Sequence, residues 1–156
     1  DQMEAMTLAT SIAVMNKGKI EQIDKPMEIY NNPKSLFVAK FVGSPQMNII
    51  NTDKDKELAL CLSKKLNIQK NIVKNFGVRP ESIKMVKKNE GDINAIIETI
   101  QPTGADWIIG LNIFNKSLFL ISSEHPIAKE NESVGLVFKS EGCHCFDSQD
   151  VRIHKN

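Results

Sequence analysis

The stretch Trp107-Ile108-Ile109-Gly110-Leu111-Asn112-Ile113 decides the fold of this chain. Every second residue from Trp107 to Ile113 is apolar, so an extended chain carries one continuous apolar face. The turn sequence Pro102-Thr103-Gly104 comes before it, and Asn115-Lys116 leads into a second apolar run at residues 118–121. Apolar runs that are joined by turn residues are typical of paired strands. We therefore expect β-structure here.

Further short strands are predicted on both sides of this stretch. Turn residues recur at intervals of roughly 8–12 residues, which is typical of a small barrel or sandwich. No stretch of helical length and periodicity interrupts residues 90–156. After a polar tip at residues 53–56, residues 57–62 are expected to return as a strand. The other predicted strands are residues 47–52, 73–78 and 92–100, and a strand in which Val134, Leu136 and Phe138 alternate with their neighbours.

Residues 1–44 have a different pattern, with apolar steps of three and four residues near the N-terminus that predict a short helix. Helical periodicity ends at Gly43-Ser44-Pro45, so we place a domain boundary there and treat residues 45–156 as a second domain. The other elements expected in the first domain are a hairpin that turns at Lys17-Gly18, a helix that begins at Pro26, and a helix that is capped by Ser35.

Six runs of sequence carry a further signal: residues 1–9, 15–22, 25–33, 37–48, 76–81 (Phe-Gly-Val-Arg-Pro-Glu) and 142–147 (Gly-Cys-His-Cys-Phe-Asp). In this order and spacing they resemble the C-terminal part of the ATP-binding subunit of bacterial ABC importers of the maltose and glycerol-phosphate type. The resemblance implies a mainly β fold. Residues 45–156 would form a regulatory OB-like (TOBE) barrel or sandwich, preceded by a short α/β remnant of the ATPase domain.

The resemblance also says which chemistry to expect. In that family a His that contacts the ATP γ-phosphate stands directly before the Asp-Gln pair, here Asp1 and Gln2, which would flank it. No Gly-x-x-x-x-Gly-Lys-Ser/Thr phosphate loop occurs in the sequence. We therefore expect no catalytic residue, no nucleotide-binding residue and no cofactor in this chain, and no ATP hydrolysis by it alone. ATP and Mg²⁺ would belong to the longer protein.

Arg79-Pro80-Glu81 resembles the hallmark of the family's regulatory domain, and Gly77 stands just before it. Pro80 can fix a tight turn, and Arg79 can offer a planar donor fork to backbone carbonyls or to a carboxylate. A structural role is favoured, and a subunit or effector contact is the functional reading. Gly104 and Asp106 are further candidates for such contacts, although the sequence around them departs from the family pattern.

Cys143-His144-Cys145 is the one cluster that suggests a metal or a nucleophile. On a strand the two thiols point to one side and the imidazole to the other, so the three side chains do not converge on one ion. The same geometry argues against a Cys–His nucleophile. We expect no metal site and interpret the cluster as a strand with buried thiols, and the low, odd cysteine count as typical of reduced thiols.

Composition limits the partners. Net charge is +1, with 41% apolar and 25% charged residues, which argues against a nucleic-acid binder. The resemblance implies a homodimer that lies in the cytoplasm at the inner face of the membrane, with transporter membrane subunits and a solute-binding protein as partners. The apolar faces of residues 1–42 are expected to be partly disordered, repacked or buried against a partner copy. A separate OB-like module that binds a small anion is the alternative.

Overall fold

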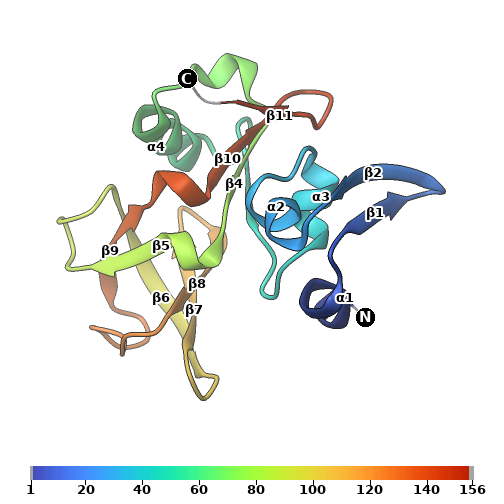
Figure 1. Cartoon of the computed structure of the whole chain (residues 1–156). Helices are drawn as coiled ribbons and strands as arrows, with labels where there is room; N and C mark the ends of the chain where they lie inside the picture. The colour runs from blue at the N-terminus through green and yellow to red at the C-terminus, as the bar shows by residue number, and fades with distance from the viewer. Residues whose placement is uncertain (1, 155–156) are drawn as a thin grey trace.

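The computed structural model describes residues 2–154, and the side chains of residues 2–4 lie outside that description. Strands make up 41% and helices 24% of the chain, so the prediction of a mainly β fold is confirmed. Within the described residues there are three antiparallel sheets and four short α-helices (Figure 1). No helix in that range has the length and apolar character needed to cross a bilayer.

The N-terminal segment is a hairpin packed on two short helices. Lys17 and Gly18 both have positive φ, at 50° and 79°, and turn β1 into β2. The side chain of Ser35 accepts a hydrogen bond from the Val38 amide and so caps α3, as predicted. A small core unites Val14, Ile29, Val38 and Val42. The elements are α1 Gln2–Leu8, β1 Ile12–Asn16, β2 Lys19–Asp24, α2 Pro26–Asn31 and α3 Leu36–Phe41.

A four-stranded sheet follows, in the order β11-β10-β4-β3. Its strands are β3 Asn48–Asn51, β4 Asn75–Val78, β10 Cys143–Phe146 and β11 Arg152–Ile153. Residues far apart in the chain therefore lie side by side, because Asn48 and Cys143 both pair with Val78. The C-terminal part of the chain, at and just before β11, also binds the N-terminal segment. The Leu36 amide donates to the Asp150 carbonyl, and the Arg152 amide donates to the Lys34 carbonyl.

The five-stranded sheet has the order β5-β9-β6-β7-β8. The alternation in β7 has the predicted result, because Ile109, Leu111 and Ile113 are all buried, whereas Trp107 at the strand's start is half-buried. The 83–86 strand, β5, did not stand out in the sequence. The strands are β5 Ile83–Val86, β6 Ile93–Pro102, β7 Trp107–Ile113, β8 Lys116–Ser122 and β9 Ser133–Phe138.

One hydrophobic core lies between the two larger sheets, with side chains such as Phe76 from one sheet and Leu111 and Leu136 from the other. None of the three sheets closes on itself within the described residues, so the arrangement is open and not a closed barrel. The division into domains at residues 44 and 45 stays a prediction, since the Ala39, Met47 and Phe146 cluster packs across that boundary.

The prediction of a returning strand at residues 57–62 is wrong. This segment lies in α4, Lys56–Leu66, which covers the core next to β3 (Figure 1). Its buried residues are Leu58, Ala59 and Leu62, which are spaced as one face of a helix. The helix ends at Asn67, which takes the left-handed conformation that asparagine tolerates well. Alanine, leucine, glutamate and lysine also favour a helix here.

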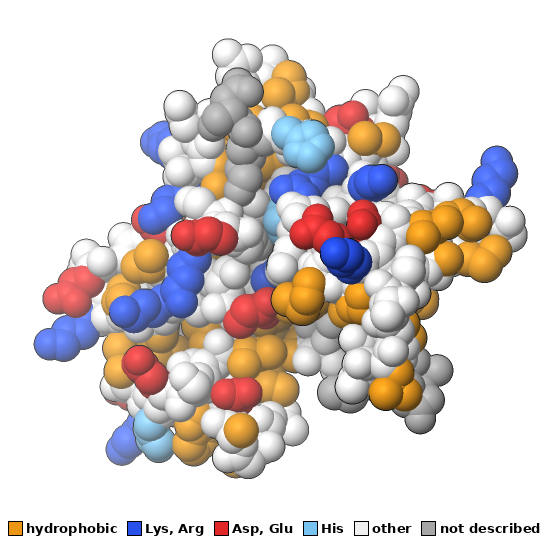
Figure 2. Space-filling model, viewed as in Figure 1, with side chains coloured by type: hydrophobic (Ala, Val, Ile, Leu, Met, Phe, Trp, Pro, Cys, Tyr) orange, Lys and Arg blue, Asp and Glu red, His pale blue; other side chains and the backbone are white. Residues whose placement is uncertain are grey.

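Large apolar side chains stay exposed on the N-terminal segment, where Figure 2 shows orange atoms gathered over the β1–β2 hairpin. Leu8 is 81% exposed and Met27 is 63% exposed. Met15, Ile20 and Ile23 are each more than half exposed as well. Apolar surface concentrated in this way is typical of an interaction site. That residues 1–42 are partly disordered, repacked or buried against a partner copy remains a prediction.

Candidate functional site

The Arg79-Pro80-Glu81 turn joins the two larger sheets. Arg79 follows β4 directly, and Pro80 begins the 3₁₀ turn η2, Pro80–Ser82, which leads into β5. The turn is held from both sides, because the Arg79 amide donates to the Gly142 carbonyl at 3.0 Å and the Ser82 amide donates to the Arg79 carbonyl at 2.9 Å. Proline suits the first position of such a turn, where its missing N–H has no partner to lose. The backbone therefore fixes where the Arg79 side chain starts.

The Arg79 side chain enters the N-terminal segment and contacts the ends of two helices. It is 3% exposed. Its Nη1 donates to the Ala39 and Val42 carbonyls at 3.2 and 2.9 Å, at the end of α3, and its Nη2 donates to the Tyr30 carbonyl at 2.8 Å, at the end of α2. The last carbonyls of a helix lack intrahelical partners and carry partial negative charge. One guanidinium therefore caps two helices, and of the two kinds of acceptor that the sequence left open, carbonyls or a carboxylate, the hydrogen bonds go to carbonyls.

Tyr30 covers this guanidinium. The Arg79 Cζ atom lies 4.0 Å from the centroid of the Tyr30 ring, which is a cation–π arrangement. The Tyr30 hydroxyl donates a hydrogen bond to the Glu81 carboxylate. Arg79 and Glu81 thus hold the same tyrosine at its carbonyl, its ring and its hydroxyl. We call these three residues the Arg79 clamp.

Gly43 makes room for the clamp. Its φ is +104°, and a Cβ built there would lie 3.3 Å from both Arg79 Nη1 and Tyr30 Cε2. Any other residue would combine a strained backbone with a close approach to the Arg79 guanidinium and the Tyr30 ring. The glycine follows α3 by two residues, so the same position ends the helix and admits the guanidinium.

Burial acts on both ionisable groups of the clamp. It lowers the pKa of Arg79, which electrostatic interactions with Tyr30 and Glu81 partly oppose, and the guanidinium stays protonated because its ordinary pKa is above 12. Burial is also the main cause that raises the pKa of Tyr30, followed by the hydrogen bond to Glu81 and the negative charge of that carboxylate. The neutral phenol is therefore the form that the fold stabilises.

This shift predicts a stability change at high pH. Tyr30 is the chain's single tyrosine, so tyrosinate absorbance reports on it alone. We expect it to ionise above the pKa of about 10 of an exposed tyrosine when folded, and at about 10 in urea. The site's contribution to the free energy of unfolding is fully present below about pH 10 and is lost as the pH rises further, because the unfolded chain then ionises first.

Variants separate the causes of the Tyr30 shift. Glu81→Gln should lower the pKa of Tyr30 toward its ordinary value, since both effects of Glu81 raise it. Tyr30→Phe should remove the part of the alkaline loss of stability that depends on Tyr30. A native-state midpoint at or below that of the urea-unfolded chain would contradict the geometry of the clamp.

The remaining sequence candidates fall in four places within the described residues. Glu81 and Asp106 line the same surface hollow of about 440 Å³, together with Lys84 and Lys139. Gly77 lies inside β4, where a Cβ would meet the Met47 Sδ atom at 2.3 Å and Phe146 Cε2 at 3.2 Å, so its role is close packing. Gly104, with φ of +96°, has open space around it in the turn between β6 and β7. Gln2 begins α1, and Asp1 lies outside the described residues.

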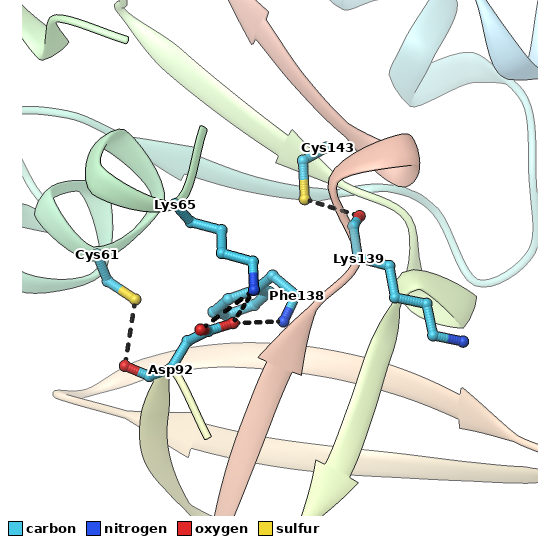
Figure 3. Close-up of polar contacts among 6 residues, drawn as sticks. All are labelled: Cys61, Lys65, Asp92, Phe138, Lys139 and Cys143. Atoms are coloured by element: carbon cyan, nitrogen blue, oxygen red, sulfur yellow. Dashed lines mark hydrogen bonds and ion pairs between the residues drawn. The ribbon is translucent and has the colours of Figure 1, made fainter. Parts of the chain in front are cut away.

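Asp92 forms a second polar cluster that the sequence did not point to (Figure 3). Its carboxylate pairs with Lys65 of α4 at 3.2 Å and accepts the Phe138 amide of β9 at 2.9 Å. Its carbonyl accepts the Cys61 thiol of α4 at 3.6 Å. Asp92 therefore ties α4 to the five-stranded sheet, which gives this cluster a structural role.

The cysteines are placed as buried or shielded groups. Cys143 and Cys145 are both 0% exposed and belong to the core, so the interpretation of a strand with buried thiols is confirmed. The Cys143 thiol donates to the Lys139 carbonyl at 3.3 Å (Figure 3). Burial, and then the charge of Asp92, raise the pKa of the Cys61 thiol. Among residues 2–154, no group of three His, Cys, Asp or Glu side chains is placed to hold a metal ion.

Thiol labelling tests this placement. In the native protein Cys61 should react first with a thiol reagent, and more slowly than cysteine in a short peptide, because its thiol is less ionised. Cys143 and Cys145 should react slower than in urea by a factor on the order of 10³ or more, since their exposure requires unfolding. Mass spectrometry assigns the sites, and Cys61→Ser is the control. Fast native labelling of Cys143 or Cys145 would instead support a reactive thiol.

Comparison with known proteins gives a consistent family. The chain is 37% identical over 163 residues to the sn-glycerol-3-phosphate import ATP-binding protein UgpC of Pectobacterium atrosepticum, which covers 96% of this chain and 44% of that protein. It is 32% identical over 163 residues to the uncharacterised ABC transporter ATP-binding protein YcjV of Escherichia coli O157:H7, and the alignment covers 96% of this chain and 45% of that protein. A putative ATP-binding protein of Brucella suis is 34% identical over 154 residues, and the alignment covers 96% of this chain and 44% of that protein.

No family model matches the chain. The curated relatives nevertheless align with almost all of it and carry consistent descriptions. The chain therefore belongs to the family of ABC transporter ATP-binding proteins and resembles their C-terminal part. It spans less than half the length of these relatives.

Proposed function

We propose that this chain is the regulatory and dimerisation region of the ATP-hydrolysing subunit of an ABC importer for sugars or related solutes. The Arg79 clamp is the observation that carries the proposal. It connects the Arg-Pro-Glu turn between the two larger sheets directly to α2 and α3, which the resemblance assigns to the end of the ATPase domain. Movement of the ATPase domain would thereby be passed to residues 45–156, which form the OB-like regulatory part.

The chemistry of transport would lie outside residues 1–156. ATP and Mg²⁺ would bind to the part of the family's ATPase domain that carries the phosphate loop, a sequence that this chain lacks. The exposed apolar side chains of the hairpin, such as Met15 and Ile20, support this proposal because they offer a packing surface for such a domain. The protein would act in the cytoplasm at the inner face of the membrane, as a homodimer with transporter membrane subunits and a solute-binding protein.

A chimera tests the proposal. The part of the Pectobacterium UgpC protein that does not align with this chain is joined to residues 1–156, and phosphate release is measured. We expect the chimera to hydrolyse ATP and the present chain alone to release no phosphate above buffer. The full UgpC protein is the positive control. A folded chimera without activity, or turnover by the chain alone, would overturn the proposal.

Sedimentation tests the dimerisation part separately. The chain, or the chimera, should associate in a concentration-dependent way, since regulatory domains in the proposed arrangement contact each other. A monomer at all concentrations in both proteins would remove dimerisation from the proposal.

A further inference from the structure

Arg79 and Glu81 stand two residues apart and face opposite environments. The Arg79 guanidinium is inside, against the ends of α2 and α3, whereas the Glu81 carboxylate is at the surface. Tyr30 connects them, because its ring lies on the guanidinium and its hydroxyl donates to the carboxylate. Glu81 is therefore the part of the clamp that solvent or a partner reaches first.

The two helices that the clamp caps depend on it. α2 and α3 have six residues each, well below the ~12–15 residues at which isolated helices become marginally stable in water. Three charge-assisted hydrogen bonds from Arg79 satisfy their last carbonyls. These bonds are strong because the Tyr30 ring keeps water from the guanidinium. If the ring moves, water competes for the same donors and both helix ends loosen.

The hollow beside the clamp is the place where another group can reach Glu81. Glu81 lines it on one side, and Asp106, Lys84 and Lys139 line it from other segments of the chain. Figure 1 shows η2, which carries Glu81, leading into β5 on the side of the five-stranded sheet that faces α2 and α3. A group that enters the hollow reaches the same Glu81 carboxylate that accepts the Tyr30 hydroxyl.

We propose that the Tyr30–Glu81 hydrogen bond is a latch, through which engagement of Glu81 from the hollow loosens the C-terminal ends of α2 and α3. Its regulatory meaning rests on the proposed function, in which these helices belong to the ATPase domain. The latch itself is a property of residues 2–154 and is tested on the chain alone.

Hydrogen exchange measures the latch. The Asn32 amide donates to Glu28 at the end of α2, and the Val42 amide donates to Val38 at the end of α3. Glu81→Gln removes the charge of the carboxylate, as a competing group would, and Tyr30→Phe removes the hydroxyl but keeps the ring. We expect each variant to speed exchange at Asn32 and Val42 by roughly three- to tenfold, because one charge-assisted bond is weakened or lost.

Two features distinguish a latch from a general loss of stability. The double variant Tyr30→Phe/Glu81→Gln should exchange no faster than the faster single variant, since both changes break one contact. Amides in β6 and β7 should exchange as in the unchanged protein. Asp106→Asn is the matched control, because Asp106 lines the same hollow and its hydrogen bonds with Thr103 use its backbone carbonyl, so exchange at both helix ends should be unchanged.

Wild-type exchange at Asn32 and Val42 in both single variants would overturn the latch, and so would an equal rise across β6 and β7 or an additive double variant. Failure of the ATPase chimera leaves these outcomes unaffected, so the latch and the proposed function fail separately.

Discussion

Arg79→Ala is expected to lower the free energy of unfolding of the N-terminal segment by roughly 3–5 kcal/mol, the cost of removing one member of a buried charge-assisted network. The substitution leaves the Tyr30, Ala39 and Val42 carbonyls without their donor, in a place that is almost fully shielded from water. It also removes the cation that complements the negative ends of α2 and α3.

Two probes show where the loss occurs. Trp107, the single tryptophan, reports on the five-stranded sheet, and circular dichroism reports on the helices. We expect their urea transitions to coincide in the unchanged protein. In the Arg79→Ala protein the part of the helical signal that comes from α2 and α3 should be lost at a lower urea concentration than the Trp107 signal, because the clamp holds these two helices and not α4 or the β6–β8 strands.

Other arginine variants act as controls. Arg79→Lys keeps a charge but loses the planar fork that reaches three carbonyls, so it should recover only part of the stability. Arg152 is the chain's other arginine, and its side chain donates to Asn32 at 3.5 Å while remaining half-buried. Arg152→Ala should cost about 1 kcal/mol or less. Equal losses for Arg79→Ala and Arg152→Ala would show that the clamp has no special role.

The sequence allowed part of this site to be predicted. The donor geometry of arginine and the fixed φ of Pro80 indicated a structural joint in which Arg79 binds carbonyls or a carboxylate, and in the structure its partners are carbonyls. The identity of the acceptors did not follow, because backbone carbonyls are present at every residue and leave no signal in sequence. Tyr30 as the ring over Arg79 was equally hidden, since the two residues lie 49 positions apart.

The fold, like the site, could be predicted only in part from the sequence. Strands with one buried face, such as β7, were predicted from period-two alternation, because one covered face imposes that pattern. The segment of α4 was misread because residues 57–62 are a short, almost entirely apolar run, which periodicity alone does not separate from a buried strand. Leu58 and Leu62, four residues apart, are both buried, as expected for one face of a helix. Which residues are buried depends on tertiary contacts, which the sequence of this segment does not reveal. Asp92 was missed because its partners come from two other elements.

Asn48→Asp is expected to lower the free energy of unfolding of the sheets by about 3–5 kcal/mol at neutral pH. Asn48 is 7% exposed and connects the two larger sheets. Its Nδ2 donates to the Val78 carbonyl at 3.1 Å and to the Phe119 carbonyl at 2.9 Å, and its Oδ1 accepts the Phe119 amide at 2.8 Å. The side chain thus pairs with the outer edge of β8 as a neighbouring strand would.

A carboxylate at this position has no donor for either carbonyl. It would place a buried negative charge against two carbonyl oxygens, whereas only the contact with the Phe119 amide would survive. Burial then raises the pKa of the new carboxyl group, so the fold favours its protonated form, which can donate one hydrogen bond. The loss of stability should therefore shrink as the pH falls, because stability from a group whose folded pKa is raised is present at low pH and is lost as the pH rises.

Asn112→Asp is the matched control. The Asn112 Oδ1 atom accepts the Asn115 amide at 3.2 Å in the β7–β8 turn, and a carboxylate accepts that bond equally well. Urea unfolding followed by Trp107 fluorescence should show a change within about 0.5 kcal/mol for Asn112→Asp, as for most surface substitutions. Asn48→Ala should fall between the two variants, since it leaves the Phe119 groups unpaired but adds no charge. If Asn48→Asp and Asn112→Asp unfold at the same urea concentration, the Asn48 side chain does not hold the two sheets together.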